Sequence, residues 1–246
     1  YIRMAGAQET VYNLQKDFSV DMQGLVAQIK SEQPDLVIVC NPNNPTGNFT
    51  DIEQIKYLLE NTSCPILLDE AYIEFAPDNA LKLLGQYRQL IILRTFSKAF
   101  ALANMRLGYV LAAPEVIELL SKMLVPYLVS GVSLAAGRAV LNNITAYEAQ
   151  LAQLGRCREA VSGALLSAGF EVVPSSTNFV FFYHQDPQVM RTVAQCLKAA
   201  SISVRDFTAN DTLHNGIRLT LGVPEQNRMV MECIGKCMVN LRKNKK

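Results

Sequence analysis

The chain has 246 residues, half of them hydrophobic, and a formal net charge of +1. This length allows one large domain or two smaller ones with a buried core, and the near-neutral charge argues against a general nucleic-acid-binding protein. The longest uncharged run, residues 123–137, is short for a membrane span and contains Pro126. We therefore interpret this run as buried core and expect no membrane association.

The first half of the chain predicts alternating strands and helices. Runs rich in Val, Ile and Leu predict strands at residues 35–40, 65–69, 90–94 and 107–112. Helical patterns follow at residues 50–62 and 114–124, and Thr50 with Glu53 predicts a capping box at the start of the first helix. This order is typical of a βαβ series, in which parallel strands are covered on both faces.

The pattern changes near residue 130, where one long helix is expected at residues 134–168. Further strands are expected at residues 170–174, 178–183, 202–207 and 216–222, and further helices at residues 187–200 and from Pro224. We therefore predict a larger α/β domain over residues 1–130 and a smaller α+β domain over residues 131–246.

Six cysteines are scattered along the chain, and no pair has the CxxC spacing of metal ligands. Cys233 and Cys237 stand one helical turn apart in an apolar pattern, which is typical of reduced thiols in a core. The opening residues lack the pattern of a signal peptide. We therefore predict a cytoplasmic protein without a metal site.

Polar clusters follow three of the predicted strands: residues 40–47, residues 69–72, and residues 95–98 with Arg106 beyond them. If these strands are parallel, the clusters meet at one sheet edge, where open α/β sheets bind their substrates. Hydroxyls and a guanidinium near a helix N-terminus suit a phosphate, a neutral lysine amine can form a Schiff base, and a buried carboxylate can pair with a protonated ring nitrogen. A phosphate, an aldehyde that forms a Schiff base and a ring nitrogen are the three groups that pyridoxal 5′-phosphate (PLP) offers to a protein.

Each residue also has a simpler explanation. Lys98 could be a solvated side chain, residues 40–47 could form only a turn, Asp69 could cap the next helix, and Arg106 could be an ordinary ion-pair partner. Because these residues occur together at the ends of successive strands, they favour a binding site at the sheet edge.

The sequences "NNPTG" (43–47), "DEAY" (69–72) and "SKAF" (97–100), with Arg106 eight residues after Lys98, resemble those of fold-type I PLP-dependent aminotransferases. The resemblance is closest to the histidinol-phosphate aminotransferase group and continues through residues 174–182, 204–207 and 217–222. It implies a three-layer α/β large domain of the PLP-transferase type with a mostly parallel sheet, a smaller α+β domain, and a homodimer.

The resemblance also implies roles for individual residues. Lys98 would form the Schiff base with PLP and then move a proton, and Asp69 would hold the pyridine nitrogen protonated. Asn44 and Tyr72 would bond the 3′ oxygen of the ring. Thr95, Ser97 and Arg106 would hold the phosphate. Arg218 would bind the substrate anion, with Arg205 as a second guanidinium suited to a phosphate, although Arg205 could instead form a surface ion pair with Asp206.

The predicted reaction is amino transfer from L-histidinol phosphate to 2-oxoglutarate, in histidine biosynthesis. The alternatives are an aminotransferase for aromatic or other amino acids, a threonine-phosphate decarboxylase, and a non-catalytic PLP-binding domain of a regulator. The family normally carries a further segment ahead of the part that matches Tyr1, with a phosphate-binding turn and an aromatic residue that stacks on PLP. We therefore expect an N-terminally incomplete large domain, and Tyr1 is not expected to be that aromatic residue.

Overall fold

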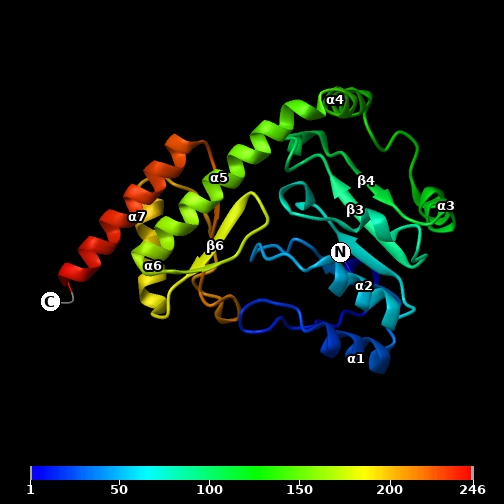
Figure 1. Cartoon of the computed structure of the whole chain (residues 1–246), viewed down its shortest axis with the longest axis horizontal. Helices are drawn as coiled ribbons and strands as arrows, with labels where there is room; N and C mark the ends of the chain where they lie inside the picture. The colour runs from blue at the N-terminus through cyan, green and yellow to red at the C-terminus, as the bar shows by residue number, and fades with distance from the viewer. Residues whose placement is uncertain (1, 245–246) are drawn as a thin grey trace.

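The computed structural model describes residues 2–244 and contains two β-sheets with helices packed around them (Figure 1). Tyr1, named above, and the last two residues of the chain lie outside the described residues. Within the described part, no helix combines the length and the hydropathy needed to cross a membrane.

The first sheet has the order β1-β2-β3-β4, formed by Val37–Cys40, Ile66–Asp69, Leu90–Thr95 and Gly108–Leu111. The first three strands are parallel, and β4 runs antiparallel to β3. This arrangement confirms the predicted α/β class with a mostly parallel sheet. It also confirms that the three polar clusters follow strands of the same direction.

Helices α1 (Met22–Glu32) and α2 (Ile52–Asn61) cover one face of this sheet. The face of α2 formed by Ile55 and Leu58 is fully buried in the same cluster as strand residues such as Leu68. The opposite face is only partly covered within the described residues, because Ile38 on β1 is 51% exposed. The expectation that both faces would be covered therefore holds for one face only.

The predicted capping box of α2 is wrong. The helix begins at Ile52, and its N-cap residue, Asp51, makes no capping hydrogen bond. Thr50 is instead tied to the loop after β1: its backbone N–H donates to the Asn41 side-chain oxygen at 2.8 Å, and its carbonyl accepts from the Asn41 amide at 2.8 Å. These two hydrogen bonds give partners to both polar groups of the Asn41 side chain, which is buried.

The second sheet is antiparallel, with the order β5-β6-β8-β7, formed by Glu171–Val173, Phe179–Tyr183, Ile217–Thr220 and Arg205–Asp206. Helices α5 (Ile144–Ala168), α6 (Pro187–Ala199) and α7 (Pro224–Asn244) pack against it around Phe182, which is fully buried (Figure 1). The division into domains at residue 130 remains a prediction.

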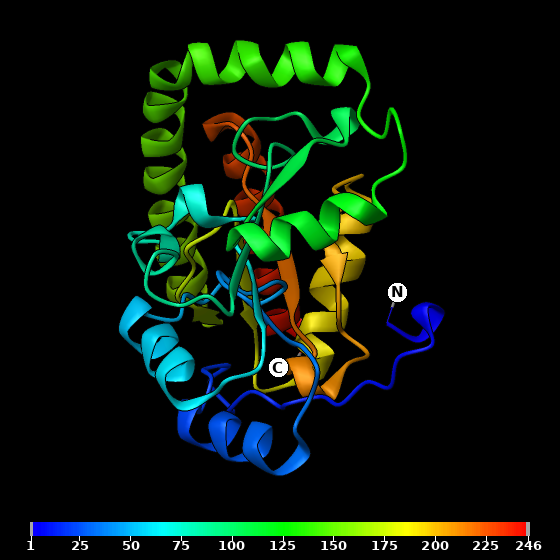
Figure 2. The same ribbon diagram turned by 90° about the vertical axis from the view of Figure 1, so that its right-hand side faces the viewer.

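The expected long helix is two helices, α4 (Gly131–Asn142) and α5. Asn143 separates them with φ −126°, ψ 30°, which is outside the helical region. The two helices run in different directions (Figure 2). An interruption of one residue leaves the apolar pattern on either side intact, so the sequence pattern did not reveal it.

The run at residues 123–137 is not buried core. Met123 at the end of α3 (Pro114–Met123) is 81% exposed, and Tyr127 is 99% exposed. Leu124, Val125, Leu128, Val132 and Leu134 are also exposed. Uncharged composition alone cannot distinguish a core segment from an apolar surface segment.

The prediction of reduced core thiols is wrong for Cys237, which forms a disulfide with Cys196 across α6 and α7, with the two Cα atoms 6.4 Å apart. Cys233 is free, as predicted. The spacing within α7 contained no information on which residue of α6 packs beside it. The cytoplasmic location inferred from reduced cysteines therefore loses that support.

Candidate functional site

The parallel strands bring the three polar clusters to one edge of the first sheet. Cys40 lies in register with Asp69, and Asp69 with Leu93. Just beyond, the Asn41 N–H donates to the Asp69 carbonyl at 3.0 Å. The chain segments that carry Asn44, Asp69 and Lys98 therefore leave the sheet at the same end.

The amine, a phenol and a carboxylate meet at this edge. The Lys98 Nζ lies 5.4 Å from the centroid of the Tyr72 ring, which is buried. Burial raises the pKa of the half-buried Asp69 carboxyl, while the N–H donated by Ala71 and the charge of Lys98 act in the opposite direction. A cation placed against Asp69 would favour its charged form further.

Two hydroxyls lie side by side at the end of β3. The Thr95 Oγ1 is 2.9 Å from the Ser97 Oγ, and it accepts the Ser97 N–H at 3.1 Å. The chain then returns through a short turn, so that the Phe96 N–H donates to the Leu107 carbonyl. Arg106 lies next to that contact, is exposed, and donates from Nη1 to the Ala103 carbonyl at 2.9 Å. The main chain next to Arg106 therefore lies beside the hydroxyls, because the Thr95 Oγ1 donates to the Leu107 carbonyl at 3.2 Å, while the Arg106 guanidinium bonds a carbonyl of its own turn.

Arg218 joins the second sheet to the first. Its Nη1 donates to the Asn44 side-chain oxygen at 2.5 Å, and its guanidinium carbon lies 4.9 Å from the centroid of the Phe179 ring. The Phe179 and Tyr72 rings form a T-shaped pair, with the centroids 5.3 Å apart. The Arg218 Nε is buried and has no hydrogen-bond partner among the described residues, which leaves a donor at this position available to an acceptor.

Arg205 lies directly opposite Arg218 in the β7–β8 pair, so the two side chains are on the same face of the sheet. Arg205 is exposed, and its guanidinium carbon is 5.9 Å from the centroid of the Phe207 ring. The alternative ion pair with Asp206 is not formed: Asp206 accepts the Thr208 N–H, and in residues 2–244 the ion pairs do not include Arg205.

Sequence reasoning missed two features of this edge. Phe179 links Tyr72 to Arg218, but a phenylalanine inside an apolar strand pattern carries no signal of such a position. Glu70 and Arg94 form a buried ion pair. The sequence does carry a sign of this pair, because each is a charged residue in or beside an apolar run, but the pattern alone indicates no role for them.

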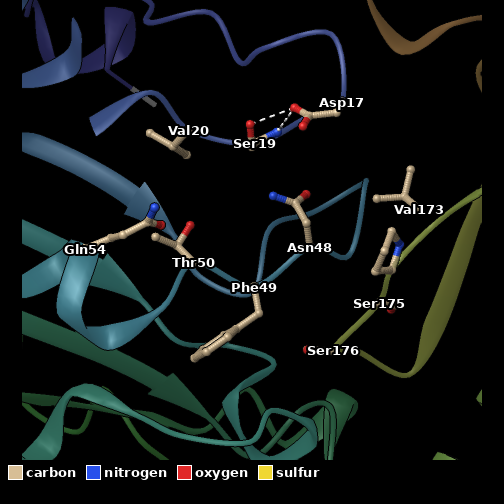
Figure 3. Close-up of a pocket in the computed structure, with 11 residues that line it drawn as sticks. Asp17, Ser19, Val20, Asn48, Phe49, Thr50, Gln54, Val173, Ser175 and Ser176 are labelled. Carbon is tan, nitrogen blue, oxygen red and sulfur yellow. Dashed lines mark hydrogen bonds between the residues drawn. The ribbon is translucent and has the colours of Figure 1, made fainter. Parts of the chain in front are cut away.

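A cavity of about 470 Å³ opens elsewhere, between the N-terminal segment, the loop before α2 and the loop after β5 (Figure 3). Its lining includes Asp17, Asn48, Gln54 and Ser175, and none of the predicted site residues. No amine or guanidinium lines it. Because the cavity lacks the groups for the predicted chemistry, the strand edge remains the candidate functional site.

Comparison with known proteins identifies the family of the chain. The family model for aminotransferase class I and II matches residues 1–234. The chain belongs to the class I and II aminotransferase family. It is 38% identical over 222 residues to histidinol-phosphate aminotransferase 1 of Carboxydothermus hydrogenoformans, covering 90% of this chain and 62% of the relative. It is 37% identical over 226 residues to histidinol-phosphate aminotransferase of Corynebacterium diphtheriae, covering 90% and 60%.

Two solved structures extend the likeness of this aminotransferase-family chain to the fold. Histidinol-phosphate aminotransferase from Sinorhizobium meliloti, in complex with pyridoxal-5′-phosphate, matches with a TM-score of 0.88 and 26% identity over 98% of this chain and 67% of that chain. A decarboxylase from Sulfurospirillum multivorans matches with a TM-score of 0.86 and 26% identity, over 95% and 70%. The predicted family resemblance is thereby confirmed, and the chain spans about three fifths of the length of the two curated relatives.

Proposed function

We propose that the full-length protein is a PLP-dependent aminotransferase that moves the amino group of L-histidinol phosphate to 2-oxoglutarate. The observation that carries this proposal is the placement of Lys98 beside Tyr72, at the sheet edge that also holds Asp69. The family match and the likeness to histidinol-phosphate aminotransferases support it. A place in histidine biosynthesis follows from that substrate.

The donor set at the edge suits PLP. Asp69, a half-buried carboxylate, would pair with the ring nitrogen, and Asn44 and Tyr72 would bond the ring oxygen. The adjacent hydroxyls of Thr95 and Ser97, with Arg106, would hold the phosphate. When bound, PLP supplies an aldehyde that condenses with amines and a ring that withdraws electrons.

The chain's own residues would then handle the proton and the substrate. Lys98 would take the proton from the substrate Cα and return it at the neighbouring carbon of the cofactor, which requires a base at that atom. Tyr72, buried beneath Lys98, would limit the positions of its Nζ. Confining the amine in this way favours proton transfer at a single atom.

Arg218 and Arg205 would bind the phosphate of the substrate. Two guanidiniums on one face of β7 and β8 match a dianion better than they match a single carboxylate. The unpartnered, buried Nε of Arg218 would donate to one of its oxygens. A 2-oxo acid would place its own carboxylate at Arg218 in the second half of the reaction.

The protein is also proposed to act as a homodimer in the cytoplasm. The exposed apolar residues of the 123–134 segment, among them Met123, Tyr127 and Val132, suit burial against a second copy. Sedimentation of the full-length protein tests the dimer, and cell fractionation tests the location. The Cys196–Cys237 disulfide is uncommon for the cytoplasm, so its redox state in cells bears on the same question.

The substrate proposal is tested by comparing kcat/KM of the full-length protein for histidinol phosphate, phenylalanine and threonine phosphate, with 2-oxoglutarate as acceptor. Histidinol phosphate is expected to be preferred, and Arg205→Ala is expected to reduce that preference by about tenfold or more, because it removes a charge-assisted contact to phosphate. A higher kcat/KM for phenylalanine would reject the proposal in favour of an aminotransferase for aromatic amino acids.

The likeness to the Sulfurospirillum decarboxylase makes decarboxylation the second candidate. Release of carbon dioxide from threonine phosphate without consumption of 2-oxoglutarate would favour it. If the protein binds PLP but acts on none of these compounds, the regulator alternative is favoured instead.

A further inference from the structure

Glu70 and Arg94 form a buried ion pair behind the proposed site. The side chain of Glu70 is fully buried and that of Arg94 is 11% exposed. The Arg94 Nε donates to the Glu70 Oε2 at 2.8 Å, and Nη2 lies 2.6 Å from the same oxygen without hydrogen-bond geometry. The other carboxylate oxygen, Oε1, accepts the Ala80 N–H at 2.9 Å. Both oxygens of Glu70 are therefore engaged inside the protein.

The pair connects the two segments that carry the proposed catalytic groups. Glu70 directly follows Asp69 and lies two residues before Tyr72, while Arg94 precedes Thr95 on the strand that leads to Lys98. The backbone of Glu70 makes the same connection, because its N–H donates to the Leu93 carbonyl at 2.9 Å. The segment bearing the acid is thus joined to the segment bearing the amine by both main chain and side chain.

Stability alone explains this pair poorly. The desolvation of two buried charges offsets most of their attraction, so an apolar pair of similar volume would stabilise the fold about as much. The arrangement also carries a second carboxyl, that of the half-buried Glu74, whose buried Oε2 has no hydrogen-bond partner among the described residues. Burial raises the pKa of Glu74, and the charge of Glu70 raises it further, whereas Arg94 opposes both effects. Burying this cluster costs folding free energy without a matching gain in stability. We therefore expect its geometry to serve the site.

We infer that Glu70, held by Arg94, is a positioning residue that sets the direction of the Asp69 carboxylate toward the cofactor. Asp69 is held on its own side by the Ala71 N–H, at 3.0 Å from its Oδ1. The Glu70 side chain fixes the opposite side of the same turn. Without it, the turn after β2 loses its connection to β3 through Arg94 and to the Ala80 N–H, and Asp69 loses its fixed direction. This inference rests on the proposed function of the same site.

The test is a double-mutant cycle on PLP affinity in the full-length protein. Glu70→Gln is expected to raise the dissociation constant for PLP about tenfold in the wild-type background. In an Asp69→Asn background, the same substitution is expected to change it by less than about twofold, because the group through which Glu70 acts has already lost its charge. Arg94→Lys, which keeps the charge but loses the Nε contact, is expected to behave like Glu70→Gln.

Asp78→Asn is the matched control. Asp78 lies on the same stretch of chain as Ala80 and pairs with Lys82 at 2.9 Å, but both side chains are exposed, so PLP affinity should not change. If Glu70→Gln fails to fold, Glu70→Asp replaces it, with the shortened side chain removing the reach to Arg94.

The outcomes separate the two proposals. Wild-type protein that does not bind PLP overturns the proposed function and this inference with it. Wild-type protein that binds PLP, together with a Glu70→Gln variant of equal affinity, overturns this inference alone. An equal loss of affinity in both backgrounds also overturns it, because that result indicates general loosening of the fold.

Discussion

Replacing Gly47 with alanine is expected to destabilise the protein at the contact between the two sheets. Gly47 has φ +89°, in the region that side chains disfavour. A Cβ at this position would lie 2.7 Å from the Ser175 Oγ, 3.0 Å from the Ser175 Cβ and 3.3 Å from the Phe179 ring. The Gly47 carbonyl also accepts the Ser176 N–H at 2.8 Å. The added methyl group therefore pushes apart two segments that are hydrogen-bonded to each other.

The magnitude follows from two costs. A non-glycine residue in a left-handed conformation costs roughly 1–2 kcal/mol, and overpacking costs about 1–3 kcal/mol. Ser175 cannot move away freely, because its Oγ donates to the Phe179 carbonyl at 2.6 Å. The free energy of unfolding should therefore fall by about 2–5 kcal/mol.

Urea unfolding measures this change through the midpoint of the transition, provided that the slope is unchanged. Gly163→Ala is the control, because Gly163 lies within helix α5 and a Cβ there meets nothing within 4 Å. That variant should be stabilised by up to about 1 kcal/mol. A Gly47→Ala protein within about 0.5 kcal/mol of wild type would refute the reasoning.

Two further predictions concern cysteines. Burial, aided by the charge of Asp69, raises the pKa of the Cys40 thiol to about 11, so its thiolate at pH 8 is about a hundredfold scarcer than in an ordinary thiol. Alkylation of Cys40 followed by peptide mass spectrometry should be correspondingly slow and should accelerate as the pH rises; a rate equal to that of a small thiol would contradict this. The Cys196–Cys237 disulfide spans 41 residues, so its reduction should lower the free energy of unfolding by about 3–4 kcal/mol. Equal urea midpoints with and without reductant would argue against that contribution.

The strand edge was predictable because it depends on local sequence. Runs of Val, Ile and Leu specify the strands, and their spacing leaves room for crossover connections, so parallel pairing brings their ends together. The positions of Asp69, Tyr72 and Lys98 near one another follow from that topology. The chain reaches Arg106 through a short 3-10 helix, Ala103–Met105.

The features that could not be predicted depend on contacts between distant segments. The bond from Arg218 to Asn44 joins residues 174 positions apart, and it depends on how the second sheet packs against the first. The disulfide required knowledge of how α6 lies against α7. The exposure of Tyr127 has the same origin, since an apolar segment is buried only where other elements of the fold cover it.

The central claim is tested most directly by trapping PLP covalently on the protein. Full-length protein is incubated with PLP, reduced with borohydride, digested, and examined by peptide mass spectrometry. The account predicts the added mass of the reduced cofactor on Lys98, and no stable adduct in Lys98→Ala. Labelling of another lysine, or an adduct that survives in Lys98→Ala, would contradict it.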